Sequence, residues 1–105
     1  MNYKYERLID DIDKNGKGSV KLFGNSMMPI INSGSIITFI KCDNYEVGDI
    51  VFCKVKSNFY AHKIIAKDTN KGYLIANNRG YENGWTHKIF GKAIQIEFEK
   101  QIKII

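Results

Sequence analysis

The chain has 105 residues, and its 16 lysine and arginine residues exceed its 11 aspartate and glutamate residues to give a net charge of +5. That length suits one domain and leaves little room for a second. The apolar runs are far shorter than the roughly 20 residues of a membrane-spanning helix, which argues against a bilayer span. All but two of the basic residues are lysine and they are scattered, so nucleic acid is not a favoured partner.

Cysteine usage points to a reducing compartment. Cys42 and Cys53 lie in or beside apolar runs, and the two cysteines and two histidines show no metal-ligand spacing. No signal peptide is recognised at the N-terminus, so we expect a cytoplasmic protein with free thiols. We predict neither a metal site nor a cofactor.

Residues 3–14 predict a short amphipathic helix, because Tyr5, Leu8, Ile9 and Ile12 recur at helical spacing. Turn residues at 15–18 end it. We therefore divide the chain into an N-terminal helix and turn, residues 1–17, and a β domain, residues 18–105.

Alternating and β-branched patterns predict short strands in the rest of the chain, at residues 20–23, 36–40, 49–55, 60–66, 73–76 and 88–98. Residues 56–58 predict a tight hairpin. Residues 77–86 are expected to be irregular, and the apolar tail 101–105 to pack on the sheet or to contact a partner. The fold class predicted is mainly β: a single small domain of coiled antiparallel sheets, or partial barrel, with a short N-terminal helix.

The most unusual segment is G-N-S-M-M-P at residues 24–29, where a predicted strand gives way to a glycine and then a serine. A serine at such a turn can stand clear of the backbone, close to amide N–H groups able to bind an oxyanion. Serine is a poor nucleophile until a base takes its proton. Ser26, flanked by Asn25 and Met27, is thus either a nucleophile or an ordinary turn residue.

His62 is the candidate base, because histidine titrates near neutral pH. Side chains alternate along a strand, so His62 and Lys63 lie on opposite faces and only one can point at Ser26. Lys63 is the alternative base if the strand register differs by one. A strand histidine that is merely hydrogen-bonded, with no catalytic part, is the other interpretation.

Residues 77–85 group hydrogen-bonding, cationic and stacking side chains in one segment, with Asn78, Arg79 and Trp85 as the candidates. Such a segment could bind a nucleotide-like or otherwise anionic small ligand. The alternative is a wide polar loop whose tryptophan packs against the core.

Four motifs in this order resemble the serine peptidases of the signal-peptidase and LexA type. They are G-N-S-M-M-P-I-I at 24–31, S-G-S at 33–35, V-G-D-I-V at 47–51 and A-H-K-I-I at 61–65. The resemblance implies the β fold of those peptidases, with Ser26 at the nucleophile position and His62 at the base position. A histidine there is typical of the archaeal and endoplasmic-reticulum branch, whereas bacterial signal peptidases and LexA-type proteins have a lysine.

The chain departs from the histidine branch further on. That branch continues with a G-D-N box and a downstream acidic residue, but residues 75–81 contain no acid. Asn78 could orient the imidazole as amides do in some cysteine enzymes, and Glu82 could supply charge. The membrane anchor of signal peptidases and the DNA-binding domain of LexA-type repressors are not recognised in the sequence.

Two functions follow from these patterns. The first is a soluble serine peptidase or hydrolase that acts on a peptide, or on its own chain, through Ser26 and His62, with strand addition beside Met27, Met28 and Ile30. The second is a catalytically inert binding module of the same fold, encoded by a phage or mobile element, that captures a ligand near Asn78 and Arg79. The sequence predicts no oligomeric state.

Overall fold

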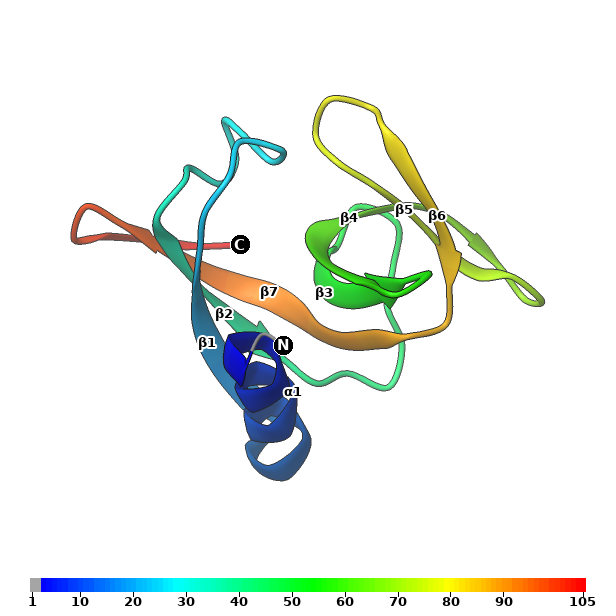
Figure 1. The fold of residues 1–105 in the computed structure, drawn as a ribbon, viewed down its shortest axis with the longest axis horizontal. Helices are drawn as coiled ribbons and strands as arrows, with labels where there is room; N and C mark the ends of the chain where they lie inside the picture. The colour runs from blue at the N-terminus through cyan, green and yellow to red at the C-terminus, as the bar shows by residue number, and fades with distance from the viewer. Residues whose placement is uncertain (1–2) are drawn as a thin grey trace.

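The computed structural model describes residues 3–105 and contains, among them, one helix and eight strands (Figure 1). The elements in chain order are α1 (Tyr3–Asn15), β1 (Lys17–Leu22), β2 (Ser35–Ile40), β3 (Ile50–Val55), β4 (Asn58–Asp68), β5 (Gly72–Ala76), β6 (Glu82–Thr86), β7 (Ile89–Phe98) and β8 (Gln101–Ile104). The predicted mainly β fold with a short N-terminal helix is confirmed.

The strands form one antiparallel sheet in the order β1-β2-β7-β3-β4-β5-β6, with β8 paired to the end of β7. The sheet is not closed, so β1 and β6 stand at its two ends. Register shifts interrupt the ladders of β7 with β2 and β3 and those of β5 with β4 and β6, and such bulges bend strands and increase their twist. Figure 1 shows the result: β3 to β6 coil together, and the long β7 connects them to β1 and β2.

Helix α1 packs on the β1–β2–β7 part of the sheet through Leu8 and Ile12, each 1% exposed. A Cβ atom on Gly18 would lie 3.0 Å from the Leu8 side chain, so glycine at this position lets the helix approach β1 closely. A second buried cluster around Val51, Ile64 and Ile75 lies within the β3–β5 part. One apolar cluster thus packs α1 against the sheet, and a separate cluster packs the coiled strands β3 to β5 together.

Local signals predicted the β3–β4 hairpin correctly, since Val55 pairs with Asn58 across two turn residues. The prediction that residues 77–86 are irregular is wrong for residues 82–86, which form β6. Asn83 and Gly84 have low strand propensity, and the pairing of β6 with β5 provides the backbone hydrogen bonds that override it. The tail forms β8 beside β7, with its side chains exposed.

Candidate active site

Ser26 lies in the loop of residues 23–34 that joins β1 to β2. Gly24 turns the chain there with a φ of 120°, which a residue with a side chain rarely adopts. The Gly24 N–H donates to Ser33 Oγ at 3.0 Å, which ties the two arms of the loop together. Met27 and Ile31 are buried in the core. Ser26 is therefore held between a tied turn and an anchored side chain.

His62 reaches this loop from β4. Its Nε2 lies 2.9 Å from Ser26 Oγ, although 36 positions separate the two residues in the sequence. On the other side of the ring, Nδ1 lies 2.7 Å from Oδ1 of Asn83 in β6. The imidazole also stacks on Tyr60, with ring centroids 4.9 Å apart, and His62 is only 7% exposed. Contacts with Ser26, Asn83 and Tyr60 fix the plane and direction of the ring.

The Asn83 contact decides which imidazole nitrogen carries the proton. An amide oxygen only accepts hydrogen bonds, so Nδ1–H donates to Asn83 Oδ1 and Nε2 directs its lone pair at the Ser26 hydroxyl. Burial lowers the pKa of His62 because it penalises the imidazolium, and the Asn83 hydrogen bond opposes part of this effect. At neutral pH the imidazole is therefore an uncharged acceptor for the Ser26 proton.

Lys63 lies on the opposite face of β4 and is linked to the Ser26 loop through Asn78. The Lys63 Nζ donates to Asn78 Oδ1 at 3.3 Å. Asn78 donates its backbone N–H to the Ser26 carbonyl and its Nδ2 to the Met28 carbonyl, both at 2.9 Å. In Figure 1 the segment that carries Asn78, between β5 and β6, faces the 23–34 loop. Lys63 and Asn78 thus hold the backbone of the loop whose hydroxyl faces His62.

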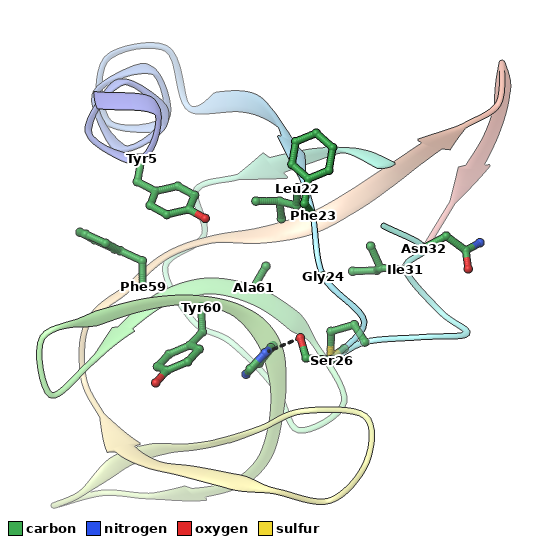
Figure 2. A pocket seen from close by; sticks show the side chains of 12 residues that line it. Tyr5, Leu22, Phe23, Gly24, Ser26, Ile31, Asn32, Phe59, Tyr60 and Ala61 are labelled. Atoms are coloured by element: carbon green, nitrogen blue, oxygen red, sulfur yellow. Dashed lines mark hydrogen bonds between the residues drawn. The ribbon is translucent and has the colours of Figure 1, made fainter. Parts of the chain in front are cut away.

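A groove with a cavity volume of about 170 Å³ opens beside Ser26 and His62. Figure 2 shows Ser26 on one side of it, with Tyr5 of α1 and Phe59 of β4 on the other. Most of the remaining lining side chains are apolar, and they come from β1, the 23–34 loop and β4. The geometry therefore brings a hydroxyl, a neutral imidazole and an apolar recess together at the surface.

A family model described as Peptidase S24-like matches residues 2–102. The chain belongs to the peptidase S24-like family. This confirms the predicted LexA-type resemblance over α1 and all of β1 to β7. No curated protein and no solved structure is similar enough to the chain to count as a match.

The S24-like chain places the other predicted residues at different distances from the groove. Met27 lines it, whereas Asn25 is exposed in the turn. Arg79 is exposed outside it, and Trp85 is half-buried in β6 with the Lys71 ammonium 5.3 Å from its ring centre. Neither Arg79 nor Trp85 is among the described residues that line the groove.

The imidazole contact that we expected of Asn78 belongs to Asn83. Sequence reasoning missed this residue because residues 77–86 were expected to be irregular. A β5–β6 hairpin would have placed Asn83 on a strand beside β5, where its side chain can reach β4. The stack of Tyr60 on His62 was also missed, although residues two apart on a strand share a face.

The buried thiol of Cys53 is not a candidate nucleophile. Cys42 and Cys53 are unpaired, and burial raises the pKa of Cys53 to about 12, so it stays protonated. Among residues 3–105, no group of three histidine, cysteine, aspartate or glutamate side chains could hold a metal ion. None of the helices in that described range has the length and apolarity to cross a membrane.

Proposed function

We propose that this S24-like domain is a serine peptidase in which Ser26 is the nucleophile and His62 the general base. The observation that carries the proposal is the pair of hydrogen bonds that joins Ser26 Oγ to Nε2 and Nδ1 to Asn83 Oδ1, at 2.9 and 2.7 Å. A hydroxyl, a neutral base and a group that orients the base are the arrangement by which serine becomes nucleophilic.

The reaction would proceed in two halves. Ser26 Oγ bonds to the carbonyl carbon of the substrate while its proton passes to His62 Nε2, which leaves a tetrahedral oxyanion and an imidazolium. The imidazolium protonates the departing amine as the C–N bond breaks, and an acyl-serine remains. Water then attacks the acyl carbon and gives a proton to Nε2, which returns it to Ser26 Oγ as the carboxylic acid product leaves.

Backbone donors for the oxyanion lie next to the nucleophile. The N–H groups of Gly24 and Met28 are used within the loop. Within the part of the chain that the structure describes, those of Ser26 and Met27 donate to no acceptor. We assign the oxyanion to the Ser26 N–H, because a preorganised donor of this kind is a large part of catalysis in acyl transfer.

Asn83 takes the position at which many serine peptidases have a carboxylate, and this has a chemical consequence. Its amide oxygen orients the imidazole but carries no negative charge to stabilise the imidazolium. The face of the Tyr60 ring, stacked on the imidazole, provides part of that stabilisation. We therefore expect slower acylation than a Ser-His-Asp triad gives.

An extended peptide is the substrate that the surrounding strands favour. β1 stands at one end of the sheet, and β5 pairs with β4 only from Lys63 onward, so residues 58–62 of β4 pair with β3 alone. The groove lies beside both segments, where a peptide strand could add to either edge. No segment of residues 3–105 occupies the groove, so self-cleavage would need a rearrangement that cleavage of a separate peptide does not.

A fluorophosphonate probe tests the proposal. We expect it to modify Ser26, as mapped by mass spectrometry, and to modify neither the Ser26→Ala variant nor, at a measurable rate, His62→Ala. Ser57→Ala, in the exposed β3–β4 turn, is the matched control and should label normally. Failure of the folded wild type to label would overturn the peptidase proposal. A melting shift with a nucleotide that disappears in Arg79→Ala would then favour the binding module.

A further inference from the structure

Two of the aromatic side chains that line the groove beside Ser26 have lysine ammonium groups near their rings. Phe23, after β1, forms one wall, and the ammonium groups of Lys4 and Lys21 lie 5.1 and 5.8 Å from its ring centre. Phe59, in β4, forms another, with the Lys54 ammonium 5.1 Å from its ring centre. Three lysines from three different elements therefore lie next to two of the aromatic side chains that line the recess.

Negative charge is kept away from this recess. None of the described residues that line it is acidic. The carboxylates of Glu6, Asp10 and Asp13 line a separate groove that α1 forms with Ile89 and Phe90. Among the described residues, Lys21 and Lys54 form no ion pair with a carboxylate. Their charges are thus available to an acidic group of a ligand at the rim of the recess.

We propose that the groove selects an extended peptide in which one apolar side chain enters the recess and acidic residues stand two positions away from it on both sides. Successive side chains of an extended peptide point to opposite faces, so every second one shares a face. When one of them fills the space between Phe23 and Phe59, the side chains two positions before and after it point to the same face and reach the rim. Aspartate or glutamate there meets Lys4 and Lys21 on one side and Lys54 on the other. This inference rests on the proposed function, because it names the substrate class of the Ser26 site.

The test measures binding separately from cleavage. Fluorescein-labelled peptides with a central leucine and, two positions to each side of it, glutamate, glutamine or lysine are titrated into Ser26→Ala, and fluorescence anisotropy gives each Kd. We expect the glutamate peptide to bind about tenfold more tightly than the glutamine peptide, the scale of two or three exposed charge pairs. The lysine peptide should bind most weakly, and the preference should shrink between about 50 and about 500 mM salt.

Variants locate the source of the preference. Lys21→Gln and Lys54→Gln, each made in Ser26→Ala, should reduce the preference for glutamate about threefold apiece. Lys103→Gln on β8 removes the same charge from a residue that lines a different pocket, and it should leave the preference unchanged. Melting curves establish that each variant is folded.

Several results would overturn the inference. They are equal binding of the glutamate and glutamine peptides, an equal loss in Lys103→Gln, or no binding of any peptide to the folded protein. Because this assay uses Ser26→Ala, it does not depend on fluorophosphonate labelling. Labelling without a glutamate preference would refute the specificity alone, and a preference without labelling would refute the peptidase activity alone.

Discussion

His62 and Lys63 are neighbours in β4, yet they meet the Ser26 loop at different places. His62 is buried and contacts the Ser26 hydroxyl. Lys63 is half-buried and contacts Asn78, which binds the carbonyls of Ser26 and Met28. The strand alternation thus separates the two contacts: one face carries the proposed base, and the other fixes the backbone of the Ser26 loop. Variants on the two faces should therefore have effects of different size and kind.

Removal of the imidazole should have the largest effect. His62→Ala takes away the proposed acceptor of the Ser26 proton, so we expect the second-order rate constant of fluorophosphonate labelling to fall about 10²–10⁴-fold. Intact-mass spectrometry over time gives this rate. His87→Ala is the matched control, since His87 is exposed and binds the Asn70 carbonyl, and it should keep the wild-type rate. Unimpaired labelling in a folded His62→Ala protein would remove His62 from the mechanism.

Loss of the group that orients His62 should be the next largest effect. Asn83→Ala leaves the buried Nδ1–H of His62 without an acceptor, which costs about 1–3 kcal/mol. If this cost falls on the tautomer that reacts, the rate of fluorophosphonate labelling should fall roughly 5- to 150-fold.

Asn83→Asp separates orientation from charge. It restores the acceptor and adds a negative charge beside the imidazole, which should raise the pKa of His62. The acid limb of the pH–rate profile should then move upward by about one pH unit or more. An unchanged limb in Asn83→Asp would argue that the acid limb does not report His62.

Asn78→Ala should act on the loop rather than on the proton transfer. It removes the hydrogen bond to the Met28 carbonyl and the acceptor for Lys63, so we expect a loss of about 1–3 kcal/mol in the free energy of unfolding. Hydrogen exchange of residues 24–31 should accelerate, while labelling slows less than in His62→Ala. Asn44→Ala, an exposed asparagine in another loop, should change none of these quantities. Slower labelling with unchanged exchange would contradict the positioning role.

The smallest effect should come from Lys63 itself. Lys63→Met keeps the aliphatic stem and removes one 3.3 Å hydrogen bond to a neutral amide, which is worth about 0.5–1.5 kcal/mol. We expect the labelling rate to stay within about threefold of the wild type, as the rate follows only part of that loss. The acid limb of the pH–rate profile should not move. A loss as large as that in His62→Ala would mean that Lys63 is the base.

The sequence predicted those parts of the fold that local patterns determine. The helical spacing of Leu8 and Ile12, the alternation of the longer strands and the turn before Asn58 were sufficient for α1, most of the sheet and the β3–β4 hairpin. β6 was missed because its residues favour turns, and only the ladder with β5 makes them a strand. That information is non-local and does not appear in a window of neighbouring residues.

The same distinction between local patterns and non-local packing applies to the residues of the candidate site. The ordered motifs singled out Ser26 and His62, whose catalytic roles remain predictions. The role of Asn83 depends on the β5–β6 register, and that of Asn78 on where its loop meets residues 26–28, so neither could be read from spacing. The lysines at the groove come from α1, β1 and β3, and only the packing of these elements brings them together.

The pH dependence of Ser26 labelling in the wild-type protein tests the central claim most directly. If the buried His62 is the base, the rate should rise with pH through a midpoint below the ordinary histidine value of 6.5 and level off near neutral pH, because burial lowers this pKa. An NMR titration of the imidazole should give the same midpoint. A rate that keeps rising well above pH 8, as it would with an ammonium that must lose its proton, would contradict the account.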